Sequence, residues 1–154
     1  MQSKPAIVFL NEPDNSETNW DLKVRESLSG NYDVMIASSL NELKVHHQER
    51  KALAILVSIL PPHGKGYEWI EALREDKSWD DLPILAVVSS PSSATRCVLY
   101  RYGADAIIGR DEDLEILCQM TSKLIRDSRF VTQLKETLEK RSCDIYVEST
   151  EIMV

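Results

Sequence analysis

Five polar residues stand at the ends of short apolar runs and are the best candidates for chemistry: Asn11, Glu12, Ser58, Ser89 and Arg110. Glu12 supplies a single carboxylate and Arg110 a guanidinium, so their formal charges cancel. Mg²⁺ prefers several carboxylate oxygens in an octahedral arrangement, so this set predicts weak attraction for a metal ion. The sequence shows no assembled set of nucleophile, base and oxyanion donors around Ser58, so a serine nucleophile is not predicted. We therefore expect hydrogen bonding or ion pairing at these positions and no enzymatic activity.

The bulk composition excludes several classes of protein. The 154 residues carry a net charge of -7, which disfavours direct binding of this segment to nucleic acid or to anionic membranes. The three cysteines are widely spaced and the histidines stand at no ligand spacing from them, so we expect reduced thiols, no metal site and no cofactor. No apolar run approaches the roughly 20 residues of a membrane span, and no signal peptide is evident. A cytoplasmic protein is expected.

Five apolar runs predict the strands that must position these residues, and they cover 6–10, 32–37, 52–57, 83–88 and 106–108. Amphipathic segments with helical spacing follow each run. The alternation predicts a parallel sheet with helices on both faces and right-handed crossovers, which is a doubly wound α/β domain. In such sheets the functional crevice lies at the carboxyl ends of the strands. The five polar residues should therefore gather at one edge of the sheet.

Several segments resemble the receiver domains of bacterial response regulators, the CheY-like family. Residues 82–89, Leu-Pro-Ile-Leu-Ala-Val-Val-Ser, resemble the family's fourth strand. Residues 103–114, which begin Gly-Ala-Asp-Ala-Ile-Ile-Gly-Arg, are similar to its "GADDYLTKPFDL" segment. Pro62 and Gly66 match the Pro and Gly that follow its phosphoacceptor. The resemblance covers roughly residues 5–125 and implies a flavodoxin-like, five-stranded parallel sheet of order 2-1-3-4-5, here with an extended C-terminal helix.

The resemblance places two parts of the family's phosphorylation pocket on altered residues. The acidic pair that follows the first strand is here Asn11 and Glu12. The phosphoacceptor aspartate falls on Ser58, or on Val57 if Pro61 is taken as the matching proline. Neither serine nor valine can form an acyl phosphate, so the resemblance implies a pocket without its nucleophile.

The remaining pocket positions are altered as well. The family's Thr or Ser after the fourth strand falls on Val88, or on Ser89 if the register slips by one residue. The lysine after the fifth strand is Arg110, and the aromatic residue three positions earlier is Ile107. Two chemical features of the family's pocket remain. They are one carboxylate in the acidic pair, at Glu12, and a positive charge after the fifth strand, at Arg110.

These departures imply a pseudo-receiver that acts through protein contacts without aspartyl phosphorylation. We interpret Ser58 as a small polar residue bonded to the backbone, with phosphorylation by another kinase as the alternative. We favour a direct ion pair between Glu12 and Arg110, the alternative being that both face water. Two rival functions remain open: a small-molecule or anion sensor that uses Ser58, Ser89 and Arg110, and a phosphoacceptor that uses another carboxylate, Glu12 or Asp14.

The predicted C-terminal helix carries a seven-residue apolar repeat, formed by Leu117, Met120, Leu124, Val131, Leu134 and Leu138. Asp127 interrupts the repeat. A helix that only covers its own domain needs an apolar face in its first part, so continuation to Leu138 favours a coiled coil with a second copy. The alternative is a single amphipathic helix that folds back on its own domain.

We expect a receiver-like domain at 1–122, a helical linker or coiled coil at 123–142 and a tail at 143–154. Within the tail, Asp144 to Met153 resembles the "VGESPAM" opening of the AAA+ domain in NtrC-like transcription activators. The Gly and Pro of that opening are missing here. The resemblance implies that the chain is the N-terminal regulatory domain of a transcription regulator. Its expected partners are a second copy of the chain and an attached or separate effector domain.

Overall fold

The computed structural model describes residues 4–12, 20–59, 65–88, 91–109 and 114–152. Its sheet consists of five parallel strands, β1 (Ala6–Leu10), β2 (Asp33–Ala37), β3 (Ala52–Ile59), β4 (Ile84–Val88) and β5 (Ala106–Gly109). The strand order is β2-β1-β3-β4-β5, which confirms the predicted flavodoxin-like topology. β3 is longer than the apolar run predicted, because Ser58 and Ile59 still pair with Val87 and Val88 of β4.

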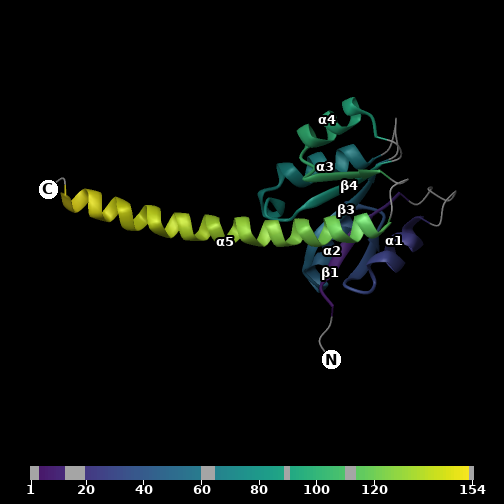
Figure 1. Ribbon diagram of the computed structural model, residues 1–154, viewed down its shortest axis with the longest axis horizontal. Helices are drawn as coiled ribbons and strands as arrows, with labels where there is room; N and C mark the ends of the chain where they lie inside the picture. The colour runs from purple at the N-terminus through teal and green to yellow at the C-terminus, as the bar shows by residue number, and fades with distance from the viewer. Residues whose placement is uncertain (1–3, 13–19, 60–64, 89–90, 110–113, 153–154) are drawn as a thin grey trace.

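The helices of the described chain are α1 (Trp20–Leu28), α2 (Leu40–Glu49), α3 (Gly66–Glu75), α4 (Ser93–Tyr102) and α5 (Leu114–Ile152), with a short 3₁₀ helix η1 (Lys77–Trp79). Figure 1 shows the sheet between two layers, with α1 and α5 on one face and α3 and α4 on the other. None of these described helices combines the length and the apolarity that crossing a membrane requires.

Each face of the sheet has its own apolar core, because successive side chains of a strand point to opposite faces. Val57, Ile59 and Val88 contribute to the core under α2, α3 and α4. Leu56 and Val87 contribute to the core under α1 and α5. The strands are buried on both faces, as expected for parallel sheets, and this explains why they read as continuous apolar runs.

Helix α5 has two different parts. Its first turns pack on the domain, where Leu117 and Ile125 are buried and Met120 and Leu124 are half-buried against the same core. From Gln133 to Arg141 every residue is exposed, and Figure 1 shows the helix continuing far beyond the body of the domain. The helix runs unbroken through the ranges 123–142 and 143–152.

Candidate functional site

The candidate site lies where β1 and β3 end side by side. Leu10 pairs with Val57, so Asn11 and Ser58 follow at the same level of the sheet. The backbone N–H of Asn11 donates to the carbonyl oxygen of Ala37, 2.9 Å away, and so extends the pairing with β2 by one residue. The side-chain Oδ1 of Asn11 is buried and has no hydrogen-bond partner among the described residues. The end of β1 thus carries a neutral amide at the position that the resemblance assigns to one carboxylate of the acidic pair.

Ser58 occupies the predicted phosphoacceptor position but lies inside β3. Its residue is 1% exposed. It pairs with Val87, one residue before the strand ends at Ile59. A hydroxyl this deeply buried is poorly placed for an enzyme to reach, which supports the interpretation of Ser58 as a structural residue.

The carboxylate of Glu12 is bound to the chain that follows β3. Its Oε1 accepts a hydrogen bond from the backbone N–H of Lys65, the residue directly before α3. A carboxylate near the first N–H groups of a helix is favourably placed, because those groups have no partner inside the helix. Glu12 therefore ties the end of β1 to the start of α3. The predicted ion pair of Glu12 with Arg110 stays a prediction, because Arg110 lies outside the described ranges.

Gly66 brings the start of α3 into close contact with the end of β3. A Cβ atom built on Gly66 would collide with Cδ1 of Ile59 and would lie 2.7 Å from the carbonyl oxygen of Ser58. Real Cβ atoms do not approach other atoms this closely, so any side chain here would force the helix away from the strand. This close packing gives a physical reason for the glycine at position 66, which the resemblance matches to the family's glycine after the phosphoacceptor.

The two positions that would respond to phosphorylation in the family are apolar and buried here. Val88 is 0% and Ile107 5% exposed. Both belong to the core under α4, together with Leu99 of that helix. Ser89, the alternative hydroxyl, lies outside the described residues. No described side chain at the end of β4 can therefore donate a hydrogen bond to a phosphoryl group.

The described residues do not form a metal centre. No group of three or more His, Cys, Asp or Glu side chains among them is arranged to hold an ion. Glu12 is a single carboxylate and is already bound to Lys65. At the ends of β1 and β3, Asn11 and Ser58 are neutral, so the described residues offer a divalent cation one carboxylate there.

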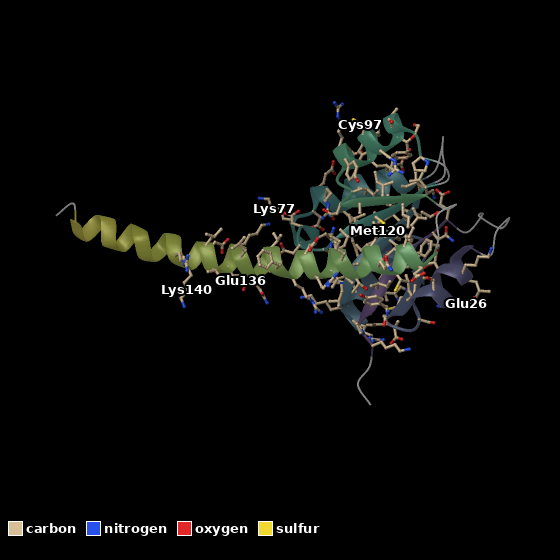
Figure 2. All side chains as sticks on the ribbon, viewed as in Figure 1. Glu26, Lys77, Cys97, Met120, Glu136 and Lys140 are labelled. Atoms are coloured by element: carbon tan, nitrogen blue, oxygen red, sulfur yellow. The ribbon has the colours of Figure 1, made fainter. Side chains whose placement is uncertain are left out.

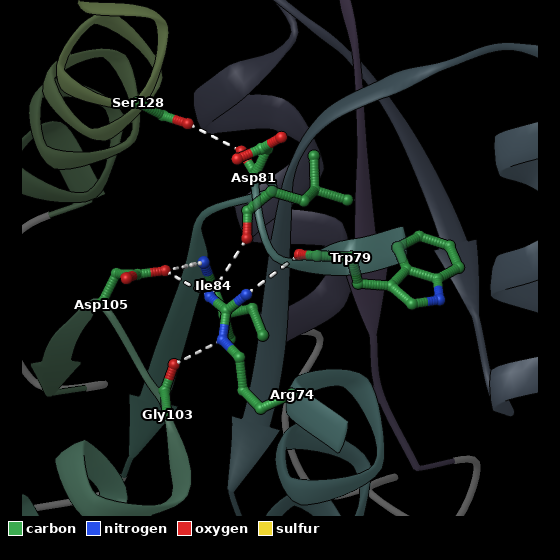
Figure 3. A network of polar contacts seen from close by, with 8 residues as sticks. Arg74, Trp79, Asp81, Ile84, Gly103, Asp105 and Ser128 are labelled. Carbon is green, nitrogen blue, oxygen red and sulfur yellow. Dashed lines mark hydrogen bonds and ion pairs between the residues drawn. The ribbon is translucent and has the colours of Figure 1, made fainter. Parts of the chain in front are cut away.

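A polar network that the sequence reasoning missed lies at the opposite end of the sheet. The guanidinium of Arg74 donates to the carbonyl oxygens of Gly103, Trp79 and Leu82, at 2.9, 3.0 and 3.1 Å. It also forms a 2.6 Å ion pair with Asp105, whose carboxylate accepts the N–H of Ile84 at 2.7 Å (Figure 3). This network joins α3, η1, β4 and the end of α4. Asp105 within the Gly-Ala-Asp motif was the one sequence signal that could have pointed to the network. The other three acceptors are backbone carbonyl oxygens, which leave no signature in the sequence.

Sequence comparison finds one family of relatives. Response regulator Rre1 of Synechocystis sp. is 26% identical over 108 residues, which cover 66% of this chain and 47% of that protein. The chain thus spans about half the length of this relative. No family model matches the chain.

Solved structures with the same fold include several receivers. Chemotaxis protein CheY4 of Vibrio cholerae superposes with a TM-score of 0.64 at 19% identity, covering 79% of this chain and 99% of that one. NtrX of Brucella abortus superposes with a TM-score of 0.69 at 16% identity, covering 88% of this chain and 29% of that one. At these identities the structures show that the fold is shared. The match to Rre1 shows similarity in sequence as well. The chain has the fold of CheY-like receivers and is similar in sequence to response regulator Rre1 over 108 residues.

Proposed function

We propose that this chain is a pseudo-receiver, a signalling domain that works through protein contacts and self-association without aspartyl phosphorylation. The observation that carries the proposal is Ser58, a buried hydroxyl at the position of the family's phosphoacceptor. An acyl phosphate forms when a carboxylate oxygen attacks phosphorus. A serine hydroxyl forms a phosphate ester instead, and it would need a base to lose its proton.

The electrostatics of the crevice support the same conclusion. An ordinary receiver gathers three carboxylates around Mg²⁺ against one lysine. In the described crevice Glu12 supplies one carboxylate, and its Oε1 is bound to the Lys65 amide. Asn11 and Ser58 are neutral. Divalent cations and phosphoryl donors should therefore be attracted far less strongly than in a working receiver.

The signal-transmitting positions support a fixed conformation. In ordinary receivers phosphorylation shifts a population between two packings of α4, β5 and α5. Val88 and Ile107 are buried in the core beneath α4 and have no hydroxyl that could respond to a phosphoryl group. We infer that the domain stays in one state, or that a partner changes that state.

We further propose that the domain regulates an attached effector domain in a cytoplasmic transcription regulator. The chain covers 47% of Rre1 and 29% of NtrX, so each of these proteins has a large part beyond the matched region. The net charge of -7 argues against contact of this segment with nucleic acid. Exposed apolar residues on α5 favour a second copy of the chain as one partner: Phe130, Val131, Leu134 and Leu138.

The anion-sensor alternative receives less support from the described residues. The groups that Asn11 and Glu12 place near the crevice are an unpartnered amide oxygen and a carboxylate. These two oxygens are acceptors, whereas an anion needs donors. Of the donors that this alternative uses, Ser58 is buried, and Ser89 and Arg110 lie outside the described residues.

Thermal unfolding with Mg²⁺ and beryllofluoride, a stable phosphoryl mimic, tests the proposal. A ligand at a hundred times its dissociation constant would stabilise the fold by about 2.7 kcal/mol. We expect no change in the melting temperature of the native chain. The double variant Asn11→Asp, Ser58→Asp restores three carboxylates with Glu12 and should gain Mg²⁺-dependent stability. A rise in the melting temperature of the native chain would overturn the proposal.

A further inference from the structure

The part of α5 beyond the domain carries apolar side chains that nothing in the described chain covers. Val131, Leu134 and Leu138 are 46, 45 and 52% exposed. Figure 2 shows Lys140 on this part of the helix, clear of the domain, whereas Met120 lies against it. An isolated helix with such a stripe gains stability by pairing with a second helix.

The sequence of α5 continues this stripe with a seven-residue period to the end of the helix. One position of the repeat, called a here, is aliphatic throughout: Leu117, Leu124, Val131, Leu138, Ile145 and Ile152. The second position, called d here, reads Met120, Asp127, Leu134, Arg141 and Glu148. Leu117 is 1% exposed and belongs to the core of its own domain, so the seam that a second copy can reach begins after it.

The charged d positions decide between the two possible directions of pairing. In a parallel pair each d residue faces the same residue of its partner. Asp127 would then face Asp127, Arg141 would face Arg141 and Glu148 would face Glu148, and each like-charged layer would be repulsive. In an antiparallel pair d positions face a positions, so Asp127 and Arg141 each face an aliphatic side chain of the partner instead of a like charge.

Matching Val131 with Leu134 of the partner sets the register of an antiparallel pair. The same register places Asp127 opposite the partner's Leu138, and Leu124 opposite the partner's Arg141. Asp127 and the partner's Arg141 then lie one helical turn apart, within reach of an ion pair.

An acidic groove lies along α5 at this level. The groove has a volume of about 370 Å³ and runs between α5 and the chain before β4 and β5, with Asp80, Asp81, Leu124, Asp127 and Val131 among its lining residues. The lining contains four aspartates and one basic residue, Lys135. Asp105 is paired with Arg74, and none of the ion pairs among the described residues involves Asp80, Asp81 or Asp127. The exposed end of α5 carries Lys140 and Arg141, which are complementary to it.

We propose that α5 pairs antiparallel with α5 of a second copy, so that the segment 130–141 of each copy lies along the acidic groove of the other. This inference rests on the proposed self-association and adds its direction, its register and the charges that set them. The paired surface includes a seam of a and d residues and one crossed contact of Asp127 with the partner's Arg141, made twice by symmetry.

A distance measurement between the two copies of Cys143 tests the direction. A Cys97→Ser, Cys118→Ser variant leaves Cys143 as the only cysteine for a spin label. In the antiparallel register the two Cys143 positions lie about 32 Å apart along the helix axis, at about 1.5 Å per residue. In a parallel pair they would lie at the same level, within roughly 20 Å including the labels. Light scattering on the same sample measures the mass in solution.

Charge exchange at the crossed contact provides the second test. We expect Asp127→Arg or Arg141→Asp alone to weaken the dimer about tenfold, and the double variant to recover most of the loss. Arg129→Asp makes the same chemical change at an exposed α5 position off the seam and should leave the dissociation constant unchanged.

The outcomes separate this inference from the proposed function. A dimer with a long Cys143 distance and recovery in the double variant supports both. A dimer with a short distance, or with no recovery, overturns the antiparallel arrangement and leaves self-association in place. A monomer at all concentrations overturns self-association and the arrangement together.

Discussion

Gly66 is the residue at which the packing of α3 against β3 can be tested most simply. Gly66→Ala adds a Cβ that collides with Ile59 and approaches the carbonyl oxygen of Ser58 to 2.7 Å. We expect a loss of roughly 1–3 kcal/mol in the free energy of unfolding, because overpacking moves backbone as well as side chains. Gly30→Ala is the matched control, since a Cβ there meets nothing within 4 Å. Equal unfolding midpoints in urea for the two variants would contradict the described contact.

His47 makes the stability of the domain depend on pH. Burial, and secondly the positive charge of Lys51, lower the pKa of His47 below its ordinary value of 6.5. Its Nδ1 accepts the N–H of Ala52 at 3.0 Å, which requires an unprotonated nitrogen. The unfolded chain takes up a proton near the ordinary pKa before the folded chain does. The stabilisation is therefore present above that pH and is lost as the pH falls through it.

We expect the free energy of unfolding to decrease from about pH 7.5 to about pH 5.5, measured by urea denaturation. In His47→Gln, which keeps an acceptor but does not titrate, the decrease should be smaller. If both proteins lose stability equally over this range, His47 is not the group responsible.

Side-chain type and offset from Gly66 and from the Gly-Ala-Asp segment led to the choice of Ser58, Val88 and Ile107 as pocket positions. Their role in a site stays a prediction, and the structure adds that all three are buried. The contact of Glu12 with Lys65 was not predicted, because its donor is a backbone N–H that carries no side-chain signature. The burial of Ser58 inside β3 was missed for a related reason, since strand ends depend on pairing with β4.

At the scale of the elements, Arg74 fixes α3 to the beginning of β4 and to the end of α4. Lysine keeps the charge but lacks the planar set of donors, so Arg74→Lys should lose most of the four contacts. We expect a decrease of roughly 2–4 kcal/mol in the free energy of unfolding. Arg101→Lys, at an exposed position of α4, is the matched control and should change little. Comparable losses in the two variants would show that the Arg74 network is not needed.

The order and type of the elements followed from the alternation of apolar and amphipathic segments, whereas the length of α5 did not. The residues after Arg141 were expected to form a tail because their letters resemble the start of another domain. They continue the helix to Ile152. No Gly or Pro occurs after Gly109, so the chain contains no strong helix breaker in this region. Seven-residue periodicity in residues 145–152 was the signal that pointed to the longer helix.

At the scale of the whole molecule, the carboxyl ends of the strands and the outward part of α5 lie toward opposite ends of the sheet (Figure 1). The first turns of α5 connect them through the core that Leu117 shares with Val87 and Ile108. In an ordinary receiver, phosphorylation at the crevice could repack this connection. The proposed pseudo-receiver function predicts that control of α5 comes instead from contacts with a second copy or with an effector domain.

The most direct test of this account is the intact mass of the protein after incubation with acetyl phosphate and Mg²⁺. The account predicts no gain in mass, because neither the buried Ser58 nor the bound Glu12 should accept a phosphoryl group. Gain of one phosphoryl group that hydroxylamine removes would show that a carboxylate is phosphorylated, and the assignment as a pseudo-receiver would then be wrong.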